Sequence, residues 1–413
     1  MVPGFQRQDG VLACDGVSLE AAAAQFGTPL YVYSKAALVA AYEAYDRAFA
    51  GVPHRICYAL KANGSGALLR ILAGLGAGAD IVSGFELEAA LRAGFPPKHI
   101  VFSGVGKTAD EIARGLDAGI GEFNAESEEE LGRISAAASA RGQTVGVTLR
   151  VNPDIDPKSH AYISTGLRQN KFGVDIALAP EILGRARSLP GLAISGVQCH
   201  IGSQITDLEP MQQAVRDLAA LSRRLLADGF PLRTIDIGGG LGLDYEGGTT
   251  LEPAALAARV RPHLEGLPLT VLVEPGRSIV GAAGALLTRV LSLKENRGKQ
   301  FVIVDAGLND LLRPALYSAF HRVEPVVSRG AETRRVDVVG PVCETGDFLA
   351  RDRNLERVQP GELLAVRDTG AYGFVMSSNY NMRPRAAEAL VEEGALRLIR
   401  RRERFEDLIR TES

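Results

Sequence analysis

Short β-branched runs alternate with longer segments of helical period from about residue 35 to residue 280, and this alternation restricts the fold more than any other feature. Eight strands that alternate with helices over roughly 250 residues are typical of a (β/α)8 barrel, so we expect the α/β class. The expected strands cover residues 55–60, 79–83, 99–103, 119–124, 146–151, 194–200, 233–237 and 269–274. The expected helices cover residues 66–75, 127–140, 208–227 and 254–264.

The pattern changes after the barrel. Residues 301–304, 335–339 and 362–366 are expected strands, with glycine and proline turns between them. We therefore expect a barrel domain over residues 35–280 and a second, mostly β domain over residues 281–413. The first 34 residues do not fit the barrel repeat, and we expect residues 1–34 to pack on the β domain.

Bulk composition excludes several classes of protein. The net charge is −3, which favours neither nucleic acid nor an anionic membrane as a partner. No stretch has the length and apolar character of a membrane span, and the N-terminus has no signal-peptide pattern. The four cysteines are scattered without a C-x-x-C pair, so we expect no metal site and a reducing, cytoplasmic location.

The stretch YALKAN (58–63) places Lys61 directly after the first expected strand. One interpretation is a surface lysine whose aliphatic chain lies along apolar residues while its ammonium stays in water. The other is a lysine that forms an imine with an aldehyde cofactor. The residue alone leaves both interpretations open.

Every expected strand ends in something polar or glycine-rich, and this is where barrels place their active sites. Each position is weak by itself, because Asn, Ser and Gly are common in any loop. The eight together indicate a site at this end of the barrel. The residues are Lys61 and Asn63, Asp80 and Ser83, Ser103, Asn124 and Glu126, Arg150 and Asn152, His200 and Ser203, Asp236 to Gly242, and Glu274 to Arg277.

The run GGGLG (238–242) follows the seventh strand, where barrels often bind phosphate. Its rival interpretation, a dinucleotide fingerprint, needs an open sheet and does not suit a barrel. A phosphate loop at Gly238, Gly239 and Gly240, a lysine and a carboxylate suit pyridoxal 5′-phosphate. Lys61 would form the imine, and Glu274 would keep the pyridine nitrogen protonated.

Ten motifs cover most of the chain in order and carry a resemblance. They are YALKAN (58–63), GADIVSGFEL (78–87), NPDIDPKSHAYISTG (152–166), NKFGV (170–174), CHIGSQI (199–205), DIGGGLG (236–242), EPGR (274–277), LLRPALYSAFH (311–321), GPVCETGDFLARDR (340–353) and GAYGFVMSSNYNMRPR (370–385). Together they resemble the diaminopimelate decarboxylase family, within the alanine-racemase-like class of pyridoxal-phosphate enzymes that includes ornithine and arginine decarboxylases.

This resemblance implies decarboxylation of meso-diaminopimelate to L-lysine, the last step of lysine biosynthesis. It implies a homodimer in which Cys343 and Glu344 enter the neighbouring subunit's site, with Cys343 as the acid that reprotonates the carbanion. His200 would stack on the cofactor ring, and Ser203 would help to bind its phosphate. The implied cofactor contacts are Lys61, Asp80, His200, Ser203, Gly238, Gly239, Gly240, Glu274, Pro275, Gly276, Arg277 and Tyr372. The implied substrate contacts are Arg277, Arg313, Tyr317, Glu344 and Tyr372.

The residue types agree with a substrate that is zwitterionic at both ends. A distal carboxylate favours a bidentate arginine, which Arg313 and Arg277 offer, and a distal ammonium favours a carboxylate such as Glu344. The alternative for Cys343 is a small buried hydrophobic residue, which its neighbours Glu344 and Asp347 in a glycine-rich turn disfavour. Three positions depart from the family pattern: Phe85, Thr345 and Gln198. None removes a charged or catalytic group, although Phe85 could reshape the floor of the site.

Alternatives remain at this stage. A decarboxylase of the same fold could act on carboxynorspermidine, ornithine or arginine. A racemase would need a second acid–base residue, usually a tyrosine, facing Lys61. A non-catalytic cofactor-binding relative would be expected to lack Lys61 or the Cys343–Glu344 pair, and all three residues are present.

Overall fold

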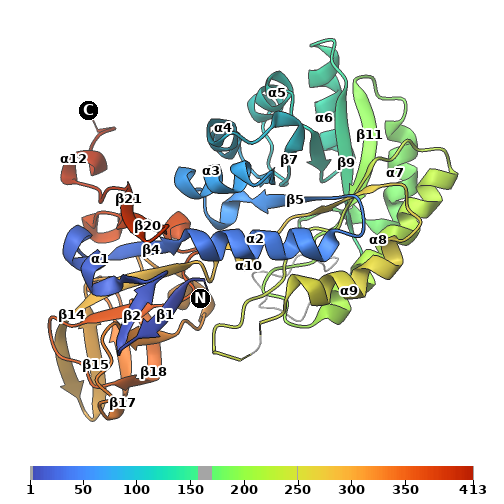
Figure 1. Cartoon of the computed structure of the whole chain (residues 1–413). Helices are drawn as coiled ribbons and strands as arrows, with labels where there is room; N and C mark the ends of the chain where they lie inside the picture. The colour runs from blue at the N-terminus through green and yellow to red at the C-terminus, as the bar shows by residue number, and fades with distance from the viewer. Residues whose placement is uncertain (1–2, 157–169, 249, 413) are drawn as a thin grey trace. The chain divides into compact units, whose positions relative to one another are not determined.

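The computed structural model describes residues 3–156, 170–248 and 250–412 and contains two compact units (Figure 1). One unit, the barrel unit, consists of Tyr42–Leu243 and Thr250–Ser278. The other, the β unit, consists of Met1–Ala41, Asp244–Thr249 and Ile279–Ser413. Residues 157–166 of the motif at 152–166 lie outside the described residues.

Eight parallel strands close into a ring, which confirms the predicted barrel. Each strand pairs with its neighbours in parallel, and the pairing of β8 with β9 closes the ring. The eight expected strands are all present within a few residues of their predicted bounds. They are β5 (His54–Ala59), β6 (Gly78–Ile81), β7 (Ile100–Phe102), β8 (Glu122–Ala125), β9 (Val145–Asn152), β11 (Leu192–Gln198), β12 (Thr234–Asp236) and β13 (Thr270–Val273). A short strand, β10 (Val174–Asp175), pairs with the end of β9 outside the ring.

Helices of the barrel unit begin at residues that suit helix starts. Ser83, Thr108, Ser127 and Asp207 each accept a hydrogen bond from a backbone N–H of the first turn. The predicted helix over 208–227 agrees with α8 in both bounds, and the other three agree within two residues. The helices are α3 (Gly66–Gly74), α4 (Gly84–Ala93), α5 (Ala109–Ala118), α6 (Glu128–Ser139), α7 (Ala179–Ala186), α8 (Leu208–Ala227) and α9 (Pro253–Leu264), and α2 (Lys35–Phe49) leads into them.

The second unit is mostly β, as expected. Its large sheet has the order β18-β17-β15-β14-β4-β20-β21, with β19 paired to β14 and β16 paired to β19. The strands are β4 (Leu30–Ser34), β14 (Gly284–Asn296), β15 (Lys299–Val304), β16 (Val323–Pro325), β17 (Thr333–Val339), β18 (Phe348–Glu356), β19 (Leu363–Val366), β20 (Ala387–Glu392) and β21 (Ala395–Arg400). A smaller sheet contains β1 (Phe5–Gln8), β2 (Val11–Cys14) and β3 (Val17–Ser18), and α1 (Leu19–Phe26) follows it.

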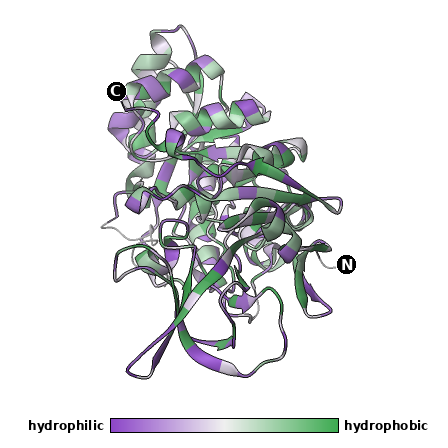
Figure 2. Cartoon of the chain, turned by 90° about the vertical axis from the view of Figure 1, so that its left-hand side faces the viewer, coloured by the Kyte–Doolittle hydropathy of each residue, from purple (hydrophilic) through white to green (hydrophobic). Residues whose placement is uncertain are grey.

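The N-terminal segment is part of the β unit's core. Strand β4 lies between β14, with which it is antiparallel, and β20, with which it is parallel. One apolar cluster joins Leu12 and Leu19 from this segment to Leu287 and Val391 from the far end of the chain. Hydrophilic and hydrophobic residues alternate along the helices and hairpins, as elements with one buried face require (Figure 2).

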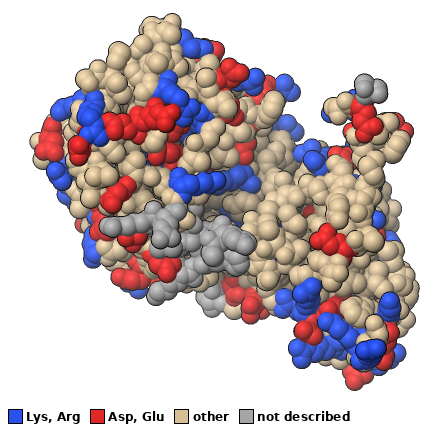
Figure 3. Space-filling model, turned by 180° about the vertical axis from the view of Figure 1, so that it is seen from behind, with Lys and Arg blue, Asp and Glu red and all other residues tan. Residues whose placement is uncertain are grey.

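The described surface carries both signs of charge. On the face in Figure 3, Lys and Arg are interspersed with Asp and Glu over both units. Among the described residues, no helix combines the length and the apolar character needed to cross a membrane.

Candidate active site

Lys61 lies in a single 3₁₀ turn, η1 (Leu60–Ala62), which directly follows β5 at the carboxyl end of the barrel. Its Nζ donates a hydrogen bond to Asp80 Oδ2 at 3.0 Å. Asp80 is buried near the end of β6, and its Oδ1 is buried without a hydrogen-bond partner among the described residues. A lysine paired with a buried carboxylate differs from a surface lysine, because its ammonium is held at a fixed point.

Glu274 follows β13 and is buried beside Lys61 and Asp80. Two amides hold it: Asn124 Nδ2 donates to Oε1 at 3.3 Å, and Gln198 Nε2 donates to Oε2 at 3.1 Å. Burial and the negative charge of Asp80 raise the pKa of Glu274 to about 7. Burial and the charge of Glu274 also raise the pKa of the neighbouring Asp236 well above its usual range. Burial and mutual repulsion therefore both favour the neutral form of these carboxyl groups.

His200 is held as a neutral imidazole. Burial and the positive charges of Lys61 and Arg150 keep its pKa well below the usual range. The backbone N–H of Gly239 donates to Nδ1 at 3.2 Å, so the ring proton is on Nε2. Arg150 is fixed in turn by Glu126, with 2.7 Å between Nη1 and Oε1.

Three glycines follow β12 where backbone segments approach one another closely. A Cβ atom would come within 2.5 Å of Cys199 O at Gly238, 2.1 Å of Glu274 O at Gly239 and 2.3 Å of Gly202 O at Gly240. Gly238 and Gly240 also have positive φ angles, +67° and +109°, which glycine adopts without strain. The N–H groups of Gly238 and Gly239 already donate to Asp236 and His200. The N–H of Gly240 donates no hydrogen bond to a described residue, so this amide is the one available to a ligand.

The EPGR turn lies beside this loop. Arg277 begins α10 (Arg277–Val280), is buried, and donates from Nη2 to Ser203 Oγ at 3.1 Å. The carbonyl of Pro275 accepts the N–H of Ala59 at 3.1 Å. A Cβ at Gly276 would lie 2.9 Å from the Cβ of Ala62. Glycine at this position therefore allows the EPGR turn to approach the 3₁₀ turn that contains Lys61.

In the β unit, Arg313 is buried at the start of α11 (Arg313–Tyr317) and is held from two sides. Nδ1 of His321 donates a hydrogen bond to the backbone carbonyl of Arg367 at 2.8 Å. Nε2 of the same ring therefore carries no proton and accepts a hydrogen bond from Nη1 of Arg313 at 2.6 Å. The ring of Tyr245 lies 4.7 Å from the guanidinium carbon and contacts His321 edge-on. Arg313 is therefore fixed in orientation before a substrate arrives.

Cys343 and Glu344 are exposed in the loop between β17 and β18. The buried carboxylate of Asp347 shapes this loop by accepting the N–H groups of Leu308 and Val342, each at 2.6 Å. The Cys343 N–H donates to Asn381 Oδ1 at 2.8 Å. The exposed thiol does not agree with the alternative of a buried hydrophobic cysteine.

The remaining expected residues are placed as follows. Tyr317 ends α11 and is half-buried. Tyr372 has a φ of +56°, a left-handed conformation that is uncommon for a bulky residue. Phe85 is 81% exposed on α4, and Gln198 contacts Glu274 as described above. The barrel unit thus brings together Lys61, Asp80, His200, Glu274 and their partners, while Arg313, Tyr317, Cys343, Glu344 and Tyr372 belong to the β unit.

Comparison with known proteins decides the family. The model of the pyridoxal binding domain of pyridoxal-dependent decarboxylases matches residues 35–281. A diaminopimelate decarboxylase from Pseudomonas aeruginosa is 51% identical over 99% of this chain and 98% of the relative. The chain belongs to the diaminopimelate decarboxylase family. Its cofactor is therefore pyridoxal 5′-phosphate, as the sequence motifs predicted.

Solved structures agree with this family assignment. Diaminopimelate decarboxylase from Helicobacter pylori, in complex with L-lysine, has a TM-score of 0.92 and 44% identity, covering 96% of this chain and 99% of that one. The enzyme from M. jannaschii, also with L-lysine, has a TM-score of 0.95 and 38% identity, covering 99% and 98%.

The described residues fit the cofactor of this family. The site offers an amine at Lys61, a carboxyl group at Glu274, a neutral imidazole at His200 and an available amide at Gly240. Asn124, which holds Glu274, was predicted as a strand-end residue of the site. Three further supporting residues were not predicted: Gln198, which holds Glu274, and His321 and Tyr245, which hold Arg313. His321 is within a family motif and Gln198 is a departure from the family pattern, so both carried a signal, whereas Tyr245 carried none.

Proposed function

We propose that the chain decarboxylates meso-diaminopimelate to L-lysine and carbon dioxide, the last step of lysine biosynthesis. The observation that carries the proposal is the grouping of Lys61, Asp80, His200 and Glu274 at the carboxyl end of the barrel. Full-length similarity to diaminopimelate decarboxylases supports the choice of substrate. The alternatives that the sequence left open, ornithine, arginine and carboxynorspermidine decarboxylases, are compared in the experiment below.

Pyridoxal 5′-phosphate, when bound, supplies an aldehyde that captures an amine and a ring that accepts electrons from a breaking bond at Cα. Lys61 would provide the amine that holds the cofactor. Glu274, oriented by Asn124 and Gln198, would keep a proton at the pyridine nitrogen. The neutral ring of His200 would face the cofactor without adding a charge. Gly240, Ser203 and Arg277 would bind its phosphate.

The distal end of the substrate distinguishes diaminopimelate from ornithine, because only diaminopimelate carries a second carboxylate. We assign its recognition to the guanidinium of Arg313, which His321 and Tyr245 hold in place. Arg277, Tyr317 and Tyr372 complete the contacts, and Glu344 pairs with the distal ammonium.

Cys343 delivers the proton that replaces carbon dioxide at Cα. Its exposure on a loop supports a role in the site of a second subunit, so we propose a homodimer with shared active sites. The four cysteines are all unpaired, which supports a reducing, cytoplasmic location.

The proposal is tested by incubating purified holoenzyme with meso-diaminopimelate, ornithine, arginine, carboxynorspermidine and lysine. Released carbon dioxide and the amine products are measured for each. We expect carbon dioxide to be released from meso-diaminopimelate together with an equimolar amount of lysine. Faster release from any other substrate would contradict the assignment.

Glu274→Gln is expected to leave cofactor bound but to lower the maximal rate strongly, because a neutral amide does not keep the pyridine nitrogen protonated. Steady-state kinetics with quantified bound cofactor check this result. An unchanged maximal rate would refute the role of Glu274.

The same variant has a second expected signature in cofactor-free protein. The folded-state pKa of Glu274 is raised to about 7, so its stabilising contribution is present below the ordinary carboxyl pKa and is lost as pH rises through 7. At pH 8 the wild type buries a charge that Glu274→Gln removes. The melting temperature of the variant should therefore be higher than that of the wild type at pH 8, and this difference in melting temperature should be smaller at pH 6. A gain independent of pH would contradict the charge explanation.

Arg313→Ala is expected to raise KM for diaminopimelate far more than for ligands without a distal carboxylate. A buried carboxylate left without its partner costs on the order of 2–5 kcal/mol. Initial-rate kinetics and competition by lysine separate the two classes of ligand. Arg334→Ala, at an exposed position on β17, serves as the matched control. An equal rise in KM for both classes of ligand would mean that Arg313 has a structural role.

A further inference from the structure

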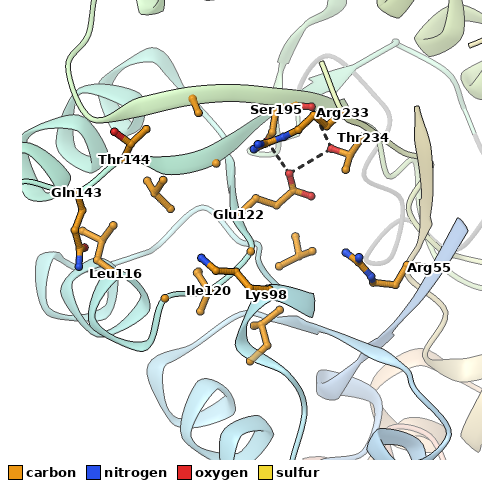
Figure 4. Close-up of a pocket in the computed structure, with 17 residues that line it drawn as sticks. Arg55, Lys98, Leu116, Ile120, Glu122, Gln143, Thr144, Ser195, Arg233 and Thr234 are labelled. Carbon is orange, nitrogen blue, oxygen red and sulfur yellow. Dashed lines mark hydrogen bonds between the residues drawn. The ribbon is translucent and has the colours of Figure 1, made fainter. Parts of the chain in front are cut away.

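A cavity of about 610 Å³ lies at the amino-terminal end of the barrel strands (Figure 4). Its walls come from the first residues of several strands, including Arg55 on β5, Glu122 on β8 and Thr234 on β12. Lys61 and Glu274 follow the opposite ends of their strands. The cavity is thus separate from the cofactor site.

Glu122 is the only carboxylate among the lining residues of this cavity, and it is 6% exposed. Three hydroxyls converge on one of its oxygens: Oε2 accepts from Ser195 at 2.6 Å, from Thr148 at 2.9 Å and from Thr234 at 3.3 Å. The other oxygen, Oε1, accepts no hydrogen bond from a described residue. Glu122 lines the cavity, so a ligand in the cavity can supply a donor to this oxygen.

Three cations line the same space from different elements. Arg55 lies on β5, Lys98 in the turn η2 (Pro97–His99), and Arg233 directly precedes β12. Figure 4 shows them arranged around Glu122. None of the three is within 4.0 Å of a carboxylate oxygen of any described residue, including Glu122. Three unpaired positive charges around one cavity favour a ligand with more than one negative group.

We propose that this cavity is a second binding site, for a small dicarboxylic amino acid. Its two carboxylates bind Arg55, Lys98 and Arg233, and its ammonium donates to Oε1 of Glu122. The charges support this class of ligand over others. Three cations and one carboxylate leave a net positive cavity, which a ligand with two carboxylates and one ammonium partly neutralises. A simple dicarboxylate would leave Glu122 without a donor, and a basic amino acid would add positive charge.

The site does not depend on the proposed decarboxylation. Cys57, Val101 and Leu272, on three strands of the barrel, form a buried apolar cluster, and Val101 also lines the cavity. Cys57 is two residues beyond Arg55 on β5, so this cluster separates the cavity from the carboxylates of the cofactor site. A ligand can therefore bind here whether or not the cofactor site is catalytically active.

The test uses isothermal titration calorimetry on the holoenzyme with L-glutamate and L-aspartate up to about 10 mM, a range that detects a Kd near 1 mM. We expect saturable binding of at least one of them, and weaker binding of glutarate, which has the same carboxylates without the ammonium. No saturable heat with either amino acid would overturn the proposal.

Variants locate the binding. Arg233→Ala should weaken binding of the amino acid at least about tenfold, because a paired carboxylate loses its partner. Glu122→Gln should weaken the amino acid about tenfold or more and leave glutarate unchanged or tighter. Arg70→Ala, at an exposed arginine on α3 outside the cavity, is the matched control and should change nothing.

One further variant separates the two sites. Arg313→Ala should leave binding of the dicarboxylic amino acid intact, because Arg313 belongs to the β unit. Binding lost in Arg313→Ala but retained in Arg233→Ala would place the ligand in the active site and refute the second site. Equal weakening of the amino acid and glutarate by Glu122→Gln would refute the role of the ammonium. Unchanged melting temperature and turnover in Glu122→Gln show that any loss of binding is local.

Discussion

Lys61→Ala is expected to abolish both turnover and the visible absorbance of the lysine-bound cofactor. The reason is that no other lysine side chain of the described barrel can replace it. Lys107 is the one buried lysine of the described residues, and its Nζ already donates to Gly104 O at 2.7 Å, Asn124 O at 2.7 Å and Glu130 Oε1 at 3.0 Å. An ammonium has three protons, so none remains for a substrate or cofactor.

Absorbance spectra and carbon dioxide release measure this effect directly. Cofactor is expected to remain partly bound through its phosphate contacts, which quantification after denaturation detects. Lys294→Ala, an exposed lysine on β14, is the control and should behave as wild type. Normal activity in Lys61→Ala would mean that another amine holds the cofactor, and the assignment of the whole site would fail.

Cys343→Ala is expected to lower the maximal rate by roughly 10²–10⁴-fold, the usual contribution of a positioned general acid. Decarboxylation leaves a carbanion that must be protonated on one face, and a thiol is a competent acid near neutral pH. Cofactor absorbance and melting temperature should be unchanged, because Cys343 is exposed and its loop is built around the buried Asp347. A rate within a factor of about three of wild type would exclude Cys343 as the acid.

Mixing Cys343→Ala with Lys61→Ala tests the shared site. If Cys343 acts in the neighbouring subunit, each mixed dimer carries one site in which both residues are intact. Random exchange makes half of the dimers mixed, so recovery reaches at most about a quarter of wild-type activity. No recovery, with subunit exchange demonstrated by mass-labelled chains, would place Cys343 and Lys61 in the same subunit's site.

The barrel could be predicted from the sequence because the signals that define its strands and helices lie within short segments of the chain. Each strand is a short apolar run followed by a helix with its own start signal, such as Thr108 with Glu111. The β unit was predicted less completely, and β4, β14 and β20 were not among the expected strands. Strand β4 pairs with β14 and β20, which lie hundreds of residues away, as in the pairing of Leu30 with Ala387, and no local pattern specifies such a pairing. Strands β14 and β20 also form hairpins with β15 and β21, so a local signal was present there and was missed.

Some residues of the candidate site could likewise be predicted from the sequence, and others could not. Lys61, His200 and Glu274 could be predicted because strand ends in a barrel meet at one edge. The hydrogen bond from Gln198 to Glu274 could not be predicted, since Gln198 stood out only as a departure from the family pattern. The stacking of Tyr245 beneath Arg313 depends on residues that lie far apart in the sequence, and it follows only from tertiary structure.

The pairing of β4 with β20 also restricts when the protein can finish folding. Strand β4 ends at Ser34 and β20 begins at Ala387, so the whole chain between them must be made before the two strands can pair. The barrel strands are made between these two strands and pair with no strand of the β unit. The β20 edge of β4 therefore stays unpaired until β20 has been made, and nascent chains are expected to need protection of this edge from aggregation until then.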